Sequence, residues 1–260
     1  MSLGSQVYAR MLAGTVLGVA LASTAACTSE RLVRGECSTY DGADVCTWGR
    51  MSGSTLVAFG ATVPIKSIEA APSEMPMVWP PKADLALNMP GAVDSAVGFK
   101  NMNIFWEPHG HPPGPYLTPH FDFHFNNISA ADVAKVDCAD STKPSVLPAG
   151  YEMPDVAIPQ LGTLVGLCVP GMGMHSLPGA ELRSATLFEK TMIAGYYHKA
   201  PIFIEPMIAR ATLLARRSFT LPIPGVAGEP AGVMLPATFE AQYDSTAQAY
   251  QFTFKMPVKS

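Results

Sequence analysis

Charged residues are scarce in this chain of 260 residues: they make up 15% of it, while 48% of its residues are hydrophobic. Soluble domains typically contain about 25% charged residues. High hydrophobicity with a net charge of only −4 excludes an intrinsically disordered chain. The same balance offers no basic surface to the phosphates of a nucleic acid, so no nucleic-acid partner is expected.

Several signatures of common enzymes are also missing. The chain has no glycine-rich phosphate loop and no Gly-x-Ser-x-Gly elbow, so neither nucleotide-dependent chemistry nor a serine hydrolase of that type is supported. It has no Cys-x-x-Cys pair, which argues against a cysteine–zinc site. Long helices are disfavoured because 24 prolines and 22 glycines punctuate the sequence. The composition therefore favours short strands and ordered loops.

The longest apolar run, residues 11–26, stands directly before Cys27. It is shorter than the roughly 20 apolar residues that span a bilayer, and it fits the hydrophobic part of a secretory signal. The small residues at its end resemble the lipobox of bacterial lipoproteins. We therefore expect a signal peptide at residues 1–26, lipidation of Cys27, and a place in the periplasm or outer cell envelope with the lipid as the only membrane attachment. Ordinary cleavage to a soluble exported protein is the alternative.

The four remaining cysteines are an even number, as expected of structural disulfides in an oxidising compartment. Four cysteines allow three pairings. The local pairing closes modest loops and is the one we expect: Cys37 with Cys46, and Cys138 with Cys168.

The pattern along the chain predicts a tether with a disulfide loop at residues 27–52 and one β-rich domain at residues 53–258. Alternating and β-branched segments predict strands at 55–59, 62–65, 97–106, 120–125, 186–197 and 201–208, and a terminal hairpin at 239–243 and 250–256. Short helices are predicted at 129–136 and 209–217. The fold class is mainly β, or α+β at most: an antiparallel β-barrel or β-sandwich with one or two short helices and long proline-rich loops. A homo-oligomer is compatible with the sequence.

Four of the six histidines fall within sixteen residues, and two of them share a predicted strand with an aspartate. Strand residues alternate between two faces, so His120, Asp122 and His124 share one face and three phenylalanines share the other. Ligand-type residues backed by buried aromatics are typical of a metal site. The alternative is an ordinary solvent-facing polar edge.

The spacing along this strand leaves the ligand set open. Residues i and i+4 lie about 13 Å apart, so His120 and His124 can join one metal only if the strand bends or bulges. Otherwise Asp122 ligates together with one of its neighbours. If both histidines ligate, Asp122 becomes the carboxylate that orients them.

Two further ligands are expected from distant parts of the chain. His175 follows a glycine-rich turn, and Glu205 interrupts an apolar strand. A buried, unpaired glutamate is costly, so it is normally paired with a base or bound to a metal. A salt bridge from Glu205 to Arg210 or Arg183 is the alternative.

The other three histidines are expected to lie outside the site. His109 and His111 stand in a proline-rich loop, where a place at the rim or plain surface exposure is expected. His198 stands at a turn between two strands and is expected at the surface.

Several blocks of the sequence carry a family resemblance: residues 110–116 (GHPPGPY), 119–125 (PHFDFHF), 172–175 (MGMH), 195–197 (GYY) and 203–208 (FIEPMI). They resemble a bacterial family of exported proteins of unknown function. The structural prototype of that family is a zinc-containing, β-rich thermophile protein controlled by a sigma-E/anti-sigma-E pair. The resemblance runs from about residue 53 to residue 250. It implies a metal site that draws on His120, His124, His175 and Glu205, and it implies no particular reaction.

Two classes of function follow. The first is an exported, lipid-anchored protein that binds a metal without catalysis; zinc is expected, and other divalent transition metals also suit nitrogen and carboxylate ligands. The second is a zinc enzyme of the cell envelope, in which three protein ligands leave room for a water that attacks a carbonyl or similar group. In the enzyme Asp122, if it is not a ligand, is the natural general base. A β-sandwich without a metal would require every histidine to be incidental.

Overall fold

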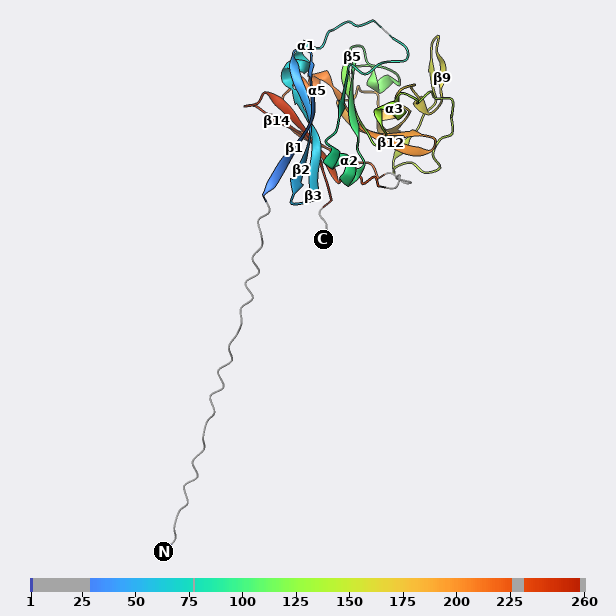
Figure 1. Cartoon of the computed structure of the whole chain (residues 1–260). Coiled ribbons are helices and arrows are strands. Elements are labelled where there is room, and N and C mark those ends of the chain that lie inside the picture. Colours follow the sequence, from blue (N-terminus) through green and yellow to red (C-terminus); the bar gives the residue numbers. More distant parts are fainter. Residues whose placement is uncertain (2–28, 77, 226–231, 258–260) are drawn as a thin grey trace.

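The computed structural model describes residues 1, 29–76, 78–225 and 232–257, which form two antiparallel sheets packed against each other (Figure 1). The six-stranded sheet has the order β1-β2-β3-β15-β14-β13, with β1 (Glu30–Tyr40), β2 (Ala43–Ser52), β3 (Thr55–Pro64), β15 (Ala249–Lys255), β14 (Thr238–Asp244) and β13 (Phe219–Pro222). The seven-stranded sheet has the order β4-β5-β6-β12-β11-β10-β7, with β4 (Leu85–Asn88), β5 (Asn101–Glu107), β6 (His120–Asn126), β12 (Ala200–Ala209), β11 (Lys190–Tyr197), β10 (Met174–Pro178) and β7 (Tyr151–Glu152).

The remaining elements are short and connect or cover the sheets. One small hairpin stands apart, made of β8 (Val156–Ile158) and β9 (Gly162–Leu164). The helices are α1 (Ile65–Ala70), α2 (Gly91–Val97), α3 (Ala130–Val133), α4 (Gly179–Leu182) and α5 (Arg210–Leu214), with single 3-10 turns η1 (Gly114–Tyr116) and η2 (Val165–Leu167). The mainly β class is confirmed. Over the described residues neither sheet closes on itself, so of the two expected arrangements the chain adopts the sandwich.

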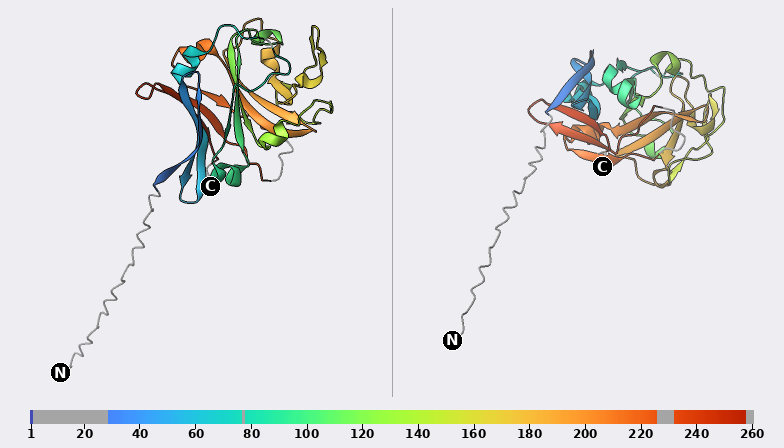
Figure 2. Two further views of the ribbon diagram at one scale, coloured as in Figure 1. Left: turned by 45° about the horizontal axis from the view of Figure 1, so that its top comes forward. Right: turned by 60° about the horizontal axis from the view of Figure 1, so that its bottom comes forward.

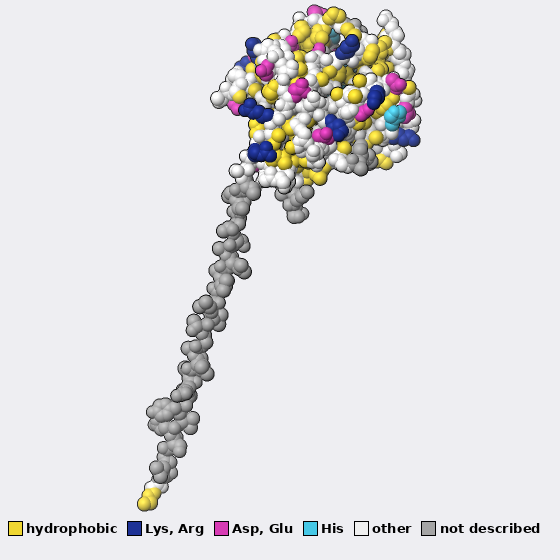
Figure 3. Space-filling model, in the orientation of Figure 1, with side chains coloured by type: hydrophobic (Ala, Val, Ile, Leu, Met, Phe, Trp, Pro, Cys, Tyr) yellow, Lys and Arg dark blue, Asp and Glu magenta, His cyan; other side chains and the backbone are white. Residues whose placement is uncertain are grey.

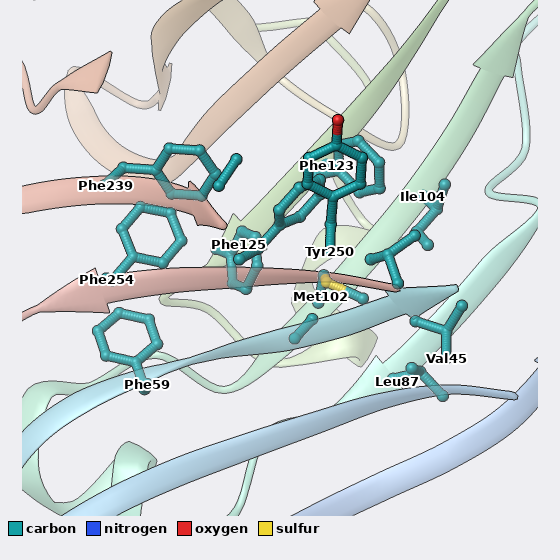
Figure 4. Close-up of a cluster of buried hydrophobic side chains, with 14 of the residues drawn as sticks. Val45, Phe59, Leu87, Met102, Ile104, Phe123, Phe125, Phe239, Tyr250 and Phe254 are labelled. Carbon is teal, nitrogen blue, oxygen red and sulfur yellow. The ribbon is translucent and has the colours of Figure 1, made fainter. Parts of the chain in front are cut away.

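The core between the sheets follows from the alternation in β6. Phe121, Phe123 and Phe125 are fully buried and face the six-stranded sheet. The rings of Phe123 and Phe125 pack edge-on against Phe252 and Phe254 of β15, with ring centroids 4.8 Å apart in each pair. Figure 4 shows this aromatic layer together with aliphatic side chains of both sheets. Full burial of each such side chain stabilises the fold by about 1.5–3 kcal/mol. The phenylalanine face of β6 is therefore part of the core.

A second apolar cluster covers the opposite face of the seven-stranded sheet. Its buried members are Tyr116, Val136, Leu167, Leu177, Phe188, Ile193, Ile202, Phe203 and Met207. They come from β11, β12 and the long connections between residues 110 and 190, and Figures 1 and 2 show α3 and β9 of these connections on the side of the sheet remote from β1–β3. Strand β6 is therefore buried on both faces, including the face that carries its histidines.

The expected tether at residues 27–52 is wrong for its described part, which forms the hairpin β1–β2 at the edge of the six-stranded sheet. Cys37 lies opposite Cys46 in this hairpin, and a disulfide joins them. The segment looks like a tether in the sequence because most side chains of β1 are exposed, whereas Val45 and Trp48 of β2 pack inward. Hairpin pairing, rather than hydrophobicity, makes β1 a strand.

The second disulfide joins Cys138 to Cys168, so both disulfides follow the local pairing expected from the sequence. Cys27 and nearly all of the predicted signal peptide lie outside the described residues. Among the residues described, no helix is both long enough and apolar enough to cross a bilayer.

Other predicted elements differ mainly at their ends. The strand predicted at 97–106 begins only at Asn101, because helix α2 precedes it and ends where Gly98 takes a left-handed conformation (φ 81°). The predicted capping box is present at α3, where the Ser129 hydroxyl accepts the Asp132 N–H. The predicted turn at His198 and Lys199 joins β11 to β12, and both residues have positive φ, as tight hairpin turns require.

Candidate metal centre

The ligand-type residues of β6 lie on its outer face, beneath the second apolar cluster. His120, Asp122 and His124 are all buried. β6 pairs with β5 continuously from His120 to Asn126, so no bulge brings His120 and His124 together. The side chains instead form two groups, and within each group the ligand atoms all lie within 4.8 Å of one another.

The first group, which we call the inner triad, consists of His124, His175 and Glu205. The register of β12 against β6 places Glu205 beside His124, and β10 supplies His175 from the other side of β11. Glu205 Oε2 lies 3.4 Å from His124 Nε2 and 3.8 Å from His175 Nε2. All three side chains are buried, so a carboxyl group and two imidazoles meet away from bulk solvent.

The second group, the outer triad, consists of His111, His120 and Asp122. The two oxygens of Asp122 contact different histidines: Oδ1 lies 3.3 Å from His120 Nε2, and Oδ2 lies 3.8 Å from His111 Nε2. The rings of His111 and His120 pack edge-on, with centroids 4.8 Å apart. Only His111 in this triad reaches solvent, with one-third of its side chain exposed (33%).

The shorter contact in each triad, 3.3 Å in the outer and 3.4 Å in the inner, suits a shared cation better than a direct hydrogen bond. Ligand atoms bound tetrahedrally at 2.0–2.2 Å from a zinc ion lie about 3.3–3.6 Å from each other, whereas N–H···O hydrogen bonds are about 2.7–3.2 Å long. Four buried atoms of the triads have no hydrogen-bond partner: His120 Nε2, Asp122 Oδ1, His124 Nε2 and Glu205 Oε2. Buried polar atoms are normally paired, so these residues fit a bound metal ion.

Three of the four histidines are oriented by main-chain carbonyl groups. A carbonyl oxygen only accepts, so the Nδ1 atom of each ring carries a proton and donates it. In the neutral rings of His120 and His175 this leaves the lone pair on Nε2 to face the carboxylates. The donor and acceptor residues are His111 with Pro112 (2.9 Å), His120 with Thr118 (2.7 Å) and His175 with Leu167 (2.9 Å).

A glycine in β11 makes room for the ring that supports the inner triad. Gly195 lies opposite both His175 and Phe203, and a Cβ atom at this position would lie 1.9 Å from the Phe203 ring. The Phe203 ring stacks on His124 at 4.4 Å and packs edge-on against His175 at 5.2 Å. The missing side chain at residue 195 therefore lets one aromatic ring position two histidines.

Burial sets the protonation of most of these groups. It lowers the pKa of His120 and of His124 to about 4 and also lowers that of His175, so all three imidazoles are neutral at pH 7, as metal ligation requires. Burial, together with the charge of Asp122, raises the pKa of Glu205 well above its ordinary value. A cation beside Glu205 would favour its ionised form.

The outer triad is already charged. Burial alone would raise the pKa of Asp122 and lower that of His111, but neighbouring groups reverse both shifts. His120 and then His111 hold the pKa of Asp122 below its ordinary value, and the hydrogen bond and charge of Asp122 raise the pKa of His111 to about 9. Burial and the charge of Asp122 raise the pKa of the nearby Glu107 to about 7.

A cavity of about 180 Å³ opens onto the two triads. Its polar lining comes from His111, Asp122, His175 and Glu107. Most of its remaining lining is apolar: Val78, Trp79, Pro81, Pro112, Ile158, Leu161, Leu164, Leu167, Val169 and Met172. Val78, Trp79 and Leu161 are exposed. The cavity thus joins a polar floor to apolar walls whose rim is open to solvent.

The alternative partners proposed for Glu205 are engaged elsewhere. Arg183 pairs with Glu152, and the Arg210 guanidinium donates to main-chain carbonyl groups that include Ile68 O. The five side chains predicted for the metal site divide between two groups: three of them form the inner triad, and the other two form the outer triad together with His111. His120 and His124, which the family resemblance assigns to one site, belong to different groups.

His109 and His198 lie at the surface as expected, since each side chain is more than half exposed and contacts an acidic residue. Of the two places expected for His111, it takes the one at the rim: it lines the cavity, is one-third exposed and lies beside Asp122 in the outer triad. Its loop folds back over the sheet: the His111 N–H donates to Tyr116 O, and Gly110 takes a left-handed conformation there with φ 66°. The glycine and prolines around His111 were the signal in the sequence for such a rigid loop.

Comparison with family models, with curated protein sequences and with solved structures gives no match. The resemblance to the exported bacterial family therefore stays a prediction. The case for a metal centre rests on the geometry of the two triads, and any function must be argued from that geometry and the adjoining cavity.

Proposed function

We propose that this protein is an exported metal-binding protein that holds a zinc ion in the inner triad. The observation that carries this proposal is the convergence of buried, unpartnered ligand atoms on Glu205. Two imidazole nitrogens and one carboxylate oxygen form a ligand set that zinc accepts readily, with a fourth position free for another ligand. The same donors also suit iron, manganese or copper, so the set favours zinc without excluding those metals.

The energetics of Glu205 support a cation at this place. Only 1% of its side chain is exposed, and no lysine or arginine of the described chain forms an ion pair with it. An ionised carboxylate is costly to bury without a partner, and a protonated one has a single O–H, which can donate to only one of the two histidine nitrogens beside it. A divalent ion resolves both problems, and its binding would stabilise the folded chain.

The disulfides support an exported protein. Bonds such as Cys37–Cys46 and Cys138–Cys168 form and persist in oxidising compartments, which indicates a location outside the cytoplasm. The apolar run at residues 11–26 and the cysteine that follows it, Cys27, are the basis for proposing a signal peptide and a lipid anchor at the periplasm or cell envelope. The anchor and the compartment are part of the proposal.

The test of metal binding is elemental analysis of protein purified from an oxidising compartment without added metal. We expect at least one equivalent of zinc per chain. Glu205→Ala and His175→Ala should each lower the zinc content, while His198→Ala, which changes an exposed histidine, should leave it unchanged. Metal-free wild-type protein, or a zinc content that neither substitution in the inner triad lowers, would reject the proposal.

A second candidate function is favoured by the cavity: a zinc enzyme acting on a carbonyl compound with an apolar body. The apolar walls would bind that body and exclude water. His175 and Asp122, one from each triad, lie at the polar end of the cavity. Zinc bound there would supply Lewis acidity, which polarises a carbonyl group or acidifies a water molecule. Glu107 lines the same cavity and is the group that would accept a proton from the reacting water. It replaces Asp122 in this role, because Asp122 contacts two histidines within the outer triad.

The enzyme is tested with p-nitrophenyl esters of increasing acyl length. We expect zinc-dependent hydrolysis that becomes faster with acyl length. Glu107→Gln should abolish turnover while the zinc content stays the same, and Glu74→Gln, at an exposed glutamate, should have no effect. Hydrolysis that is absent, or that survives both zinc removal and Glu107→Gln, would exclude this function and leave the metal-binding proposal intact.

A further inference from the structure

We infer that the metal centre is dinuclear: the outer triad holds a second divalent cation beside the ion of the inner triad. This deepens the proposed function and rests on it. The sequence pattern implies one site for all the ligand residues, whereas the structure divides them between two carboxylates, Asp122 and Glu205, each with its own pair of histidines.

The geometry of β6 keeps the two triads apart yet adjacent. His120 and His124, which belong to different triads, lie four residues apart on one face of the strand, a spacing of about 13 Å. Because β6 is paired without a bulge, this spacing is not reduced locally. One ion with bonds of about 2 Å cannot bind both groups of three, but two neighbouring ions can.

The outer triad shares two features with the inner one: buried ligand atoms without a hydrogen-bond partner, and histidine rings oriented by carbonyl groups. His120 Nε2 and Asp122 Oδ1 have no hydrogen-bond partner, and their side chains are 0% and 5% exposed. They lie 3.3 Å apart, the separation of two ligands on one metal ion. The rings of His120 and His111 are each held by a carbonyl group at Nδ1, which directs Nε2 toward Asp122.

Three carboxyl groups lie close to the two triads. Asp122 and Glu205 are buried, and the partly buried Glu107 lies opposite His120 in the sheet. In the part of the chain that the structure describes, no lysine or arginine pairs with any of these three carboxyl groups. The carboxylates of the two triads therefore have no lysine or arginine competing with a metal ion for their oxygens.

The outer triad is the more open of the two to the cavity. Two of its residues, His111 and Asp122, line the cavity, whereas the inner triad reaches it through His175, and His124 and Glu205 are 2% and 1% exposed. His111 also stands on a loop and is partly open to solvent. The outer ion should therefore exchange faster and bind more weakly than the inner ion.

The experiment counts ions per chain. The mature protein with both disulfides intact is stripped with a chelator, titrated with Zn²⁺ alone and examined by native mass spectrometry. We expect two ions in the wild type, one in His111→Ala and two in His109→Ala. The last two variants form a matched pair in one loop, because His109 is exposed and its ring contacts Glu74 at the surface. His175→Ala should also retain one ion.

Proximity is tested by loading with Cu²⁺ and recording electron paramagnetic resonance spectra. Two adjacent ions should show dipolar broadening in the wild type, and His111→Ala should give the spectrum of an isolated ion. His111 is partly exposed, so its replacement is compatible with folding, which a circular dichroism melt verifies. The decisive comparison therefore does not depend on a buried variant.

The other outcomes are distinguishable. A single ion in the wild type that survives His111→Ala overturns the second site and leaves the proposed function standing. A single ion that both His111→Ala and His175→Ala remove means one shared site, which also overturns the inference. If the wild type binds no ion, the proposed function fails together with it.

Discussion

Adding one methyl group at Gly195 should disturb the inner triad without touching any ligand. In Gly195→Ala the new Cβ atom would lie 1.9 Å from Cε1 of Phe203 and 2.0 Å from its Cζ. Carbon atoms in contact are normally about 3.5–4.0 Å apart, so the Phe203 ring must move by about 1.5–2 Å. That ring stacks on His124 and packs against His175, so both imidazoles must shift with it or lose its support.

The expected cost has two parts. Overpacking of a buried site costs about 1–3 kcal/mol, which in a chain of this size lowers Tm by about 2–12 °C, since 1 kcal/mol corresponds to roughly 2–4 °C. Loss of the groups that orient metal ligands typically lowers affinity about 10- to 100-fold. We expect a similar decrease in zinc affinity at the inner triad.

Calorimetric melting and competition titration with a chromophoric chelator measure the two effects. Gly114→Ala is the matched control, because a Cβ atom there meets nothing within 4 Å. Adding Phe203→Leu to Gly195→Ala should restore part of the lost stability, because the two positions are coupled. If Gly195→Ala keeps the Tm and zinc affinity of the wild type, the proposed support of the triad by Phe203 is wrong.

Three further predictions concern the whole chain. Zinc at 1,000 times its dissociation constant should stabilise the folded protein by about 4 kcal/mol. Removing the zinc with a chelator should therefore lower Tm by about 8–16 °C. An unchanged Tm would contradict a structural contribution of the ion. Replacing Cys138 and Cys168 by serine opens a loop with a sequence separation of 30, which should cost about 3–4 kcal/mol in a denaturant titration. Loss of this disulfide should also weaken zinc binding, because Cys168 follows Leu167, whose carbonyl orients His175. The control is the variant with serine at Cys37 and Cys46, which lie in the other sheet and should leave zinc binding unchanged. Finally, a radiolabelled fatty acid should mark the protein in cells, and Cys27→Ser should abolish the label; labelling that survives this substitution would exclude the lipid anchor.

Local features of the structure could be predicted from the sequence because they depend on neighbours along the chain. The alternation in β6 determines that three phenylalanines face one way and His120, Asp122 and His124 the other, wherever the strand lies. The hairpin turn at His198 and the cap at Ser129 are equally local. The hydrophobic pattern did not predict β1, because most side chains of this strand are exposed and its position is determined by pairing with β2.

The long-range arrangement of the site depends on the strand order and register, which no local pattern encodes. Glu205 meets His124 only because β12 lies beside β6 in one register; a shift of one residue would turn its carboxylate toward the sandwich core. His175 reaches the same place across β11, where Gly195 leaves room.

The sequence by itself therefore determined which residue types could bind a metal and which face of β6 presents them, because both follow from side-chain chemistry and the period of a strand. Only the tertiary structure decided how those residues are grouped. The spacing along β6 separates His120 from His124, and the loop that carries His111 folds back onto Asp122. The residues that the sequence predicts as one metal site therefore form two triads.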